Sequence, residues 1–253
     1  MPSTKLASRN ARINSALDIK RRAKEAPQGP PQRCIVMGCN RLTQRAARTG
    51  LSETHCKAHV EFHRRHGSYW RKSYSAAEIA PYRRAARRWL RANREDGEVA
   101  SAIARLDSLL ADSGRPQSAF DLRGLSGKEK ARIALARLRE AGKGGRDLLE
   151  IALSIAATYK AIGPRGNPEF RQVQVAKLAH RLASGTVLRN HEGTPYRDIY
   201  TAAKPGMFTR YPRATGGYMR LLGEAILKRA GMASDPETIN AVLALASQGE
   251  GKP

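Results

Sequence analysis

The first third of the fold is decided by two short segments, CIVMGC at residues 34–39 and CKAH at residues 56–59. They contain all three cysteines of the chain, and His59 follows Cys56 at a spacing of three residues. Structural zinc takes four Cys and His ligands, commonly in two close pairs. Gly38 allows the first segment to double back, and residues three apart on a helix share one face. The pattern predicts a zinc site formed by Cys34, Cys39, Cys56 and His59.

Two other histidines leave the fourth ligand ambiguous in the sequence. His59 has the better spacing from Cys56, but His63 lies one helical turn further on and is an alternative ligand. His55 adjoins Cys56 and is expected to point elsewhere. Nearby cations favour thiolates over thiols. The alternative to a metal site is three reduced cysteines packed as small apolar side chains.

The stretch from Cys34 to Ser68 resembles a family of small zinc-binding modules in phage and mobile-element proteins, some of them associated with HNH endonucleases. The shared pattern is C-x4-C…C-x2-H followed by arginines and a glycine, and it covers about residues 33–68 only. The resemblance implies the four ligands named above, with Arg64 and Arg65 close to nucleic acid. The expected fold class is mostly α, with a treble-clef-like zinc module followed by a helical domain.

The nuclease part of this resemblance is not met by the residues present. An HNH site needs a histidine base, a metal-binding carboxylate or histidine, and an orienting asparagine. Residues 33–68 contain only Glu53 and Glu61 as carboxylates, and the segment 190–192 (NHE) lies far downstream. We therefore expect a non-enzymatic protein and keep a zinc-supported HNH-like nuclease as the alternative.

The chain is strongly basic, and its charge is uneven. Its 253 residues contain 46 Lys and Arg against 22 Asp and Glu, a formal net charge of +24. Residues 1–94 contain 22 basic and 5 acidic residues, so most of the excess lies in the first third. Such an excess attracts polyanions. The expected partner is nucleic acid, with DNA favoured over RNA, in a protein of phage, plasmid or bacterial origin. An RNA-binding or assembly protein is a further alternative.

We expect four parts along the chain: a basic flexible arm over 1–32, the zinc module over 33–68, a basic linker helix over 69–94, and an all-helical domain over 95–253. Ser52 or Thr54 is expected to cap the helix of the zinc module. A capping box at 75–78 starts the linker helix, which Pro81 is expected to kink or restart. Helical periodicity then predicts helices near 99–110, 128–140, 148–162, 168–184, 216–230 and 236–247, with an irregular segment over 186–213.

Two groups of cations are predicted to contact nucleic acid. The first, Arg64, Arg65, Arg71 and Lys72, is interleaved with Tyr69, Trp70 and Tyr74. Cations beside aromatic rings suit phosphate contact and base stacking, although Trp70 and Tyr74 could instead cover the small zinc core. The second group is a helical stripe of Arg84, Arg87, Arg88 and Arg91. This stripe suits a phosphate backbone or a major groove, or is simply a solvated cationic face.

Nothing in the sequence points to a membrane. No run approaches the roughly 18 apolar residues of a membrane span, and the N-terminus lacks the apolar segment of a secretory signal. Three cysteines clustered with a histidine favour a reducing compartment. We expect a cytoplasmic protein without a membrane partner, whose helical domain offers a surface for a protein partner or for self-association.

Overall fold

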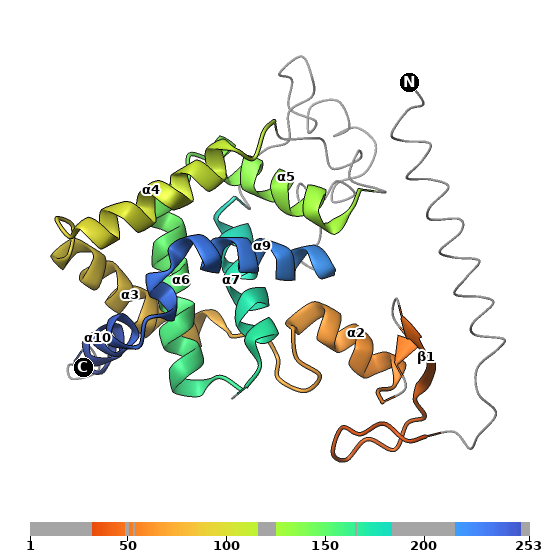
Figure 1. The fold of residues 1–253 in the computed structure, drawn as a ribbon. Coiled ribbons are helices and arrows are strands. Elements are labelled where there is room, and N and C mark those ends of the chain that lie inside the picture. The colour runs from red at the N-terminus through yellow and green to blue at the C-terminus, as the bar shows by residue number, and fades with distance from the viewer. Residues whose placement is uncertain are drawn as a thin grey trace, which may run out of the picture. The chain divides into compact units, whose positions relative to one another are not determined.

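The computed structural model describes residues 32–48, 51–52, 54–115, 125–164, 166–183 and 216–248. These residues are mostly helical, which confirms the predicted fold class (Figure 1). The chain divides into two compact units, Met1–Lys72 and Ser73–Pro253. No helix in the described ranges is both long and apolar enough to cross a membrane. The predicted basic arm, apart from residue 32, and the predicted irregular segment lie outside the described residues.

The first unit combines a turn, a small hairpin and one helix. An isolated bridge joins Arg33 and Leu42, and the antiparallel strands β1 (Gln44–Arg48) and β2 (Leu51–Ser52) follow. Helix α2 (Lys57–His66) ends at Gly67, whose φ of 75° lets its N–H bond to the carbonyl of His63. Turn, hairpin and helix follow one another in the order of the predicted treble clef.

Few apolar side chains are buried among the residues of the first unit whose side chains are described. Helix α2 contains no buried residue. The buried side chains among the described residues of the unit are Cys34, His55, Cys56 and Ser68. An isolated ten-residue helix is unstable in water without packing. Helix α2 must therefore be stabilised by something other than a hydrophobic core.

The second unit is a helical bundle with a continuous core. Its elements are α3 (Ala76–Ala92), α4 (Gly97–Ala111), α5 (Gly127–Glu140), α6 (Gly145–Ile162), α7 (Pro168–Leu182), α9 (Gly217–Ala230), the 3-10 turn η2 (Met232–Ser234) and α10 (Pro236–Ser247). Helix α6 lies in the middle of this unit and packs against α3, α4, α7, α9 and α10 (Figure 1). Every residue from Leu148 to Thr158 except Glu150 is buried. The predicted helices beyond residue 95 are confirmed within a few residues at each end.

Helix α3 belongs to this core, whereas the sequence predicts a separate linker helix over 69–94. Its apolar stripe, with Ile79, Ala85, Ala86 and Leu90, is buried against the bundle. The capping box is present, since Ser75 Oγ accepts from the N–H of Glu78. The helix continues through Pro81, so the predicted restart does not occur. A proline this close to the N-terminus removes one backbone hydrogen bond, and packing of the helix offsets that loss.

Helices α7 and α9 approach each other closely at Gly223. A Cβ atom at this position would overlap the backbone carbonyl of Gln172. The missing side chain therefore sets the distance between the two helices. By contrast, a Cβ on Gly217 at the start of α9 would meet no atom within 4 Å.

Candidate metal centre

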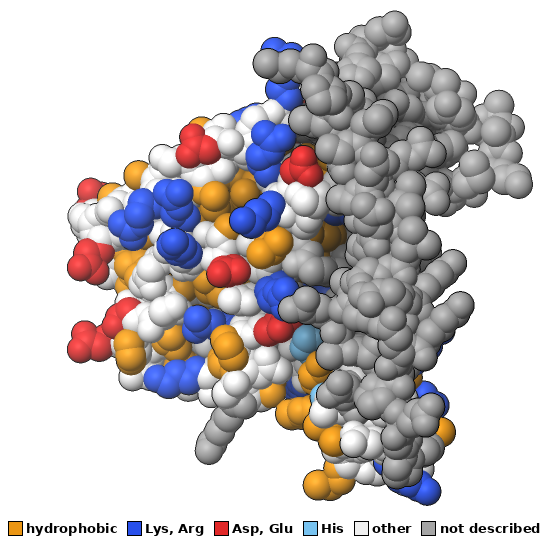
Figure 2. All heavy atoms as spheres, turned by 45° about the vertical axis from the view of Figure 1, so that its right-hand side comes forward, with side chains coloured by type: hydrophobic (Ala, Val, Ile, Leu, Met, Phe, Trp, Pro, Cys, Tyr) orange, Lys and Arg blue, Asp and Glu red, His pale blue; other side chains and the backbone are white. Residues whose placement is uncertain are grey.

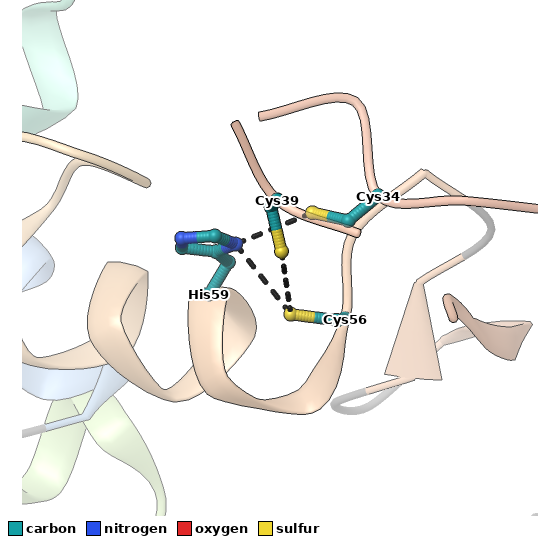
Figure 3. A group of neighbouring side chains, drawn as sticks. All are labelled: Cys34, Cys39, Cys56 and His59. Carbon is teal, nitrogen blue, oxygen red and sulfur yellow. Dashed lines mark hydrogen bonds between the residues drawn. The ribbon is translucent and has the colours of Figure 1, made fainter. Parts of the chain in front are cut away.

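The four predicted ligand residues lie together in the structure. The donor atoms of Cys34, Cys39, Cys56 and His59 are all within 4.8 Å of one another, and no disulfide joins the cysteines. Their side chains converge on one point from the turn and from the start of α2 (Figure 3). Cys34 and Cys56 are buried, and the other two are half-buried. The structure therefore contains a plausible Cys3His metal centre.

Local backbone bonds hold the first cysteine pair in place. Gly38 has a φ of 76°, which a residue with a side chain rarely adopts, and the N–H of Cys39 bonds back to the carbonyl of Val36 at 2.9 Å. The N–H of Cys34 donates to the carbonyl of Arg41 at 2.9 Å. The chain is thereby folded into a tight turn that directs both thiols inward.

The second pair is positioned by the start of helix α2. Cys56 is the N-cap residue of α2, and His59 is the third residue of that helix. The N–H of Ile35 bonds to the carbonyl of Thr54 at 3.0 Å, which ties the cysteine turn to the segment before the helix. The predicted capping of α2 by Ser52 or Thr54 is not seen, because Ser52 Oγ accepts from the N–H groups of Thr54 and His55 instead.

The distances between donor atoms match those around a tetrahedral ion. Cys39 and Cys56 Sγ are 3.9 Å apart, and His59 Nδ1 lies 3.2 Å from Cys34 Sγ and 3.5 Å from Cys56 Sγ. With Zn–S bonds of about 2.3 Å, a tetrahedron places two sulfurs about 3.8 Å apart. The other nitrogen of His59 points away from the cysteines (Figure 3). Three thiolates and one imidazole suit zinc among the common biological metals.

The structure resolves the ambiguity among the three histidines. His55 donates to or accepts from Thr54 Oγ1 at 2.8 Å, and its ring stacks on Tyr69 with a centroid distance of 3.5 Å. His63 stacks on Tyr69 at 4.2 Å. Both rings are thus engaged by the tyrosine, and His59 alone of the three belongs to the cluster.

Electrostatics at the centre favour a thiolate on Cys34. Burial alone would raise the pKa of this thiol, but hydrogen bonds from the backbone N–H groups of Cys56 and Val36 and from His59 lower the pKa to about 6. At Cys39 the N–H of Arg41 favours the thiolate, while burial and the two neighbouring thiols raise its pKa. Sulfurs this close repel one another once ionised, and a bound cation would remove that repulsion.

The aromatic residues near this centre do not share one role. Tyr74 is buried in the core of the second unit, where its ring meets Phe170 edge-on. Trp70 is 63% exposed. The residue that packs beside the histidines is Tyr69, which the sequence offers only as one of three nearby aromatics. No spacing rule links a tyrosine to histidines six and fourteen residues before it, so only the folded chain reveals this stack.

The first predicted group of cations comprises two residues in the last turn of α2 and two that follow the helix in sequence. Arg64, Arg65 and Lys72 are exposed, and Arg71 is half-buried. Arg64 and Arg65 belong to a last helical turn that also contains His63 and His66. This cluster of positive charge lies at the negative end of the helix dipole, where cations are stabilised.

The second predicted group lies on α3 and is partly engaged within its own unit. Arg84 and Arg91 are exposed. Arg87 Nε is 2.9 Å from a carboxylate oxygen of Glu150 on α6, and Arg88 donates to the carbonyl of Leu245 on α10. The hydrogen bond and charge of Glu150 raise the pKa of Arg87. All four arginines of the stripe are exposed, and two of their guanidinium groups are engaged by neighbouring helices.

Three comparisons with known proteins, by family models, by curated sequences and by solved structures, each found no match. The resemblance to small zinc modules of phage and mobile-element proteins therefore stays a prediction from residues 33–68.

Proposed function

We propose that this protein is a zinc-containing, non-enzymatic nucleic-acid-binding protein, with DNA as the favoured ligand. The observation that supports zinc is that helix α2 buries no side chain in a hydrophobic core. Helix α2 has no buried residue, yet its first turn reaches three cysteines through His59. A metal ion bound by these four side chains supplies the fold energy that apolar packing does not. With all four tetrahedral positions taken by protein atoms, the ion has a structural role.

The ligand is inferred from the groups that this unit exposes. Arg64, Arg65 and Lys72 lie within nine residues of one another, and the exposed indole of Trp70 lies between them in sequence. Cations bind phosphates, and an exposed aromatic ring stacks on bases. On the face shown in Figure 2, Lys and Arg side chains are interspersed with Asp and Glu, so the helical unit presents no single basic patch there. The unit with the metal centre is the better candidate for the main contact.

Salt dependence tests the proposal directly. Each phosphate that a cation neutralises releases counterions, so log Kobs should fall linearly with log salt concentration, with a slope of about −0.9 per phosphate contacted on duplex DNA. Titrations of one duplex, its single strand and a structured RNA at one salt concentration rank the three ligands. Affinity that does not change with salt would contradict nucleic-acid binding.

Trp70 supplies a second test with an internal comparison. We expect Trp70→Ala to weaken binding by about 1–3 kcal/mol if the indole stacks on a base. Trp89→Phe changes the only other tryptophan, which is half-buried in the second unit, and leaves Trp70 as the fluorophore. In that variant, nucleic acid should quench the fluorescence. An unchanged signal on saturation would show that Trp70 takes no part.

A further inference from the structure

An open pocket lies between helices α3 and α10 of the second unit. Its volume is about 400 Å³, and its described lining consists of Pro81, Arg84, Arg87, Arg88, Arg91 and Ala246. Four of these six residues are arginines, and none of the six is acidic. The pocket therefore concentrates guanidinium groups from one helix face.

Two of the four arginines are held by the surrounding fold. Glu150 on α6 binds both Arg83 and Arg87, at 2.6 and 2.9 Å. Arg88 is fixed by its hydrogen bond to the carbonyl of Leu245 near the end of α10. A guanidinium held in this way loses less conformational freedom when a ligand binds, because part of its ordering is already complete.

The other two arginines leave the pocket with unbalanced charge. Arg84 and Arg91 are exposed, and neither forms an ion pair with a described residue. Arginines at spacings of three and four along a helix repel one another. Glu150 is shared with Arg83, and together with Asp147, whose charge also acts on Arg87, it supplies two negative charges, which cannot offset four positive ones. An anion with more than one negative charge would relieve this repulsion.

The helices packed beside α3 limit which groups of a ligand its arginines can contact. A DNA major groove is about 12 Å wide and a helix with its side chains is about 10–12 Å across, so a reading helix needs both flanks free. Helix α3 packs against α6 and α10, and the end of α10 lies beside the arginines themselves. The arginines can therefore reach a phosphate in the pocket, and the neighbouring end of α10 favours phosphate contact over insertion among base edges. Guanidinium groups bind phosphate oxygens in pairs of parallel hydrogen bonds.

We propose that the pocket between α3 and α10 is a binding site for linked phosphate groups that together carry more than one negative charge, with Arg84 and Arg91 as its principal donors. These groups can be neighbouring phosphodiesters of a nucleic-acid backbone or the phosphates of a free oligophosphate. Binding of a nucleic-acid backbone rests on the proposed function, whereas binding of a free oligophosphate does not.

The test uses the full-length protein and pyrophosphate as the probe. Isothermal titration at constant ionic strength should show binding to the wild type. The double variant Arg84→Gln/Arg91→Gln should bind at least about tenfold more weakly per arginine removed, as expected for charge-assisted hydrogen bonds. The control Arg132→Gln/Arg181→Gln removes the same charge from exposed positions on α5 and α7. It should change the affinity by less than about twofold, as screened surface charges do.

Two results would overturn the site: no pyrophosphate binding by the wild type, or equal losses in the pocket variant and in its control. Duplex DNA then identifies the source. If the pocket variant weakens DNA binding equally for unrelated sequences, the phosphate is that of the backbone. If it loses pyrophosphate but keeps DNA affinity, the ligand is a free oligophosphate. If the wild type binds pyrophosphate and no nucleic acid, the pocket stands and the proposed function fails.

Discussion

Single residues of the metal centre serve two purposes at once. Cys56 begins helix α2 as its N-cap residue and also contributes a sulfur to the cluster. It makes no side-chain cap hydrogen bond. The ligand therefore takes the place that serine, threonine or aspartate usually occupies at a helix start.

The histidines offer a matched pair of substitutions at this scale. His59 and His63 lie one turn apart on α2, but only His59 is in the cluster. We expect His59→Gln to weaken zinc affinity by more than about 100-fold, because loss of a mere outer-shell partner already costs about 10- to 100-fold. His63→Gln should retain about one zinc per chain, the content of a four-ligand site. Elemental analysis and competition with a chromogenic chelator measure both. The reverse pattern would identify His63 as the ligand.

At the scale of elements, the second unit depends on how closely its helices pack. Helices α7 and α9 are in contact where Gly223 faces the backbone of Gln172. Helix α6 meets α4 in the same way at Gly145, where a Cβ would overlap the carbonyl of Ile103. Interiors packed at crystal-like density cannot absorb an added atom without a shift of backbone.

This packing predicts opposite outcomes for two alanines on the same helix. Gly223→Ala should destabilise the protein by about 1–3 kcal/mol, the usual cost of overpacking. For a unit of this size, that corresponds to a fall in Tm of roughly 2–12 °C. Gly217→Ala places its methyl group in open space and should leave Tm unchanged or slightly raised. Thermal unfolding followed by circular dichroism compares the two. Equal effects would show that α7 and α9 are not in close contact.

At the scale of the whole molecule, the two units differ in what stabilises them. The second has a continuous apolar core that includes most of α6. In the first, the apolar side chains known to be buried are two cysteines of the metal centre, the burial of residues 44–51 not being described. In small modules with a structural metal, the ligand residues are brought together only on folding. The free energy of metal binding therefore contributes directly to the free energy of folding.

Metal removal should therefore unfold one unit and spare the other. In the presence of a strong zinc chelator, trypsin should cut rapidly at Lys57, Arg64 and Arg65, whereas Arg146 and Lys160 on α6 should stay protected. Mass spectrometry of the fragments measures both regions in one sample. Added zinc should restore protection of α2. Protection of α2 that persists without metal would mean that another force stabilises the helix.

How much the sequence predicts depends on the range of the interactions involved. The helices beyond residue 95 follow from local periodicity, and the ligand set follows from short spacings between cysteines and a histidine. The position of α3 within the core does not follow from local patterns. Arg83 and Arg87 bind Glu150, which lies more than 60 residues further along the chain. The choice among three histidines likewise depends on Tyr69, which reaches His55 and His63 only in the folded chain.

Because helix α2 contains no buried residue, its amino-acid sequence can vary more than that of a helix in a core. A residue that packs in a core is constrained by volume and shape, whereas exposed positions tolerate substitution within about 0.5 kcal/mol. On α2 the cluster constrains His59 and stacking constrains a few neighbours, but four positions of the helix are exposed: Lys57, Glu61, Arg64 and Arg65. Mutation can therefore alter what this helix recognises without loss of its fold, which makes α2 a natural position for diversification and a convenient scaffold for engineered specificity.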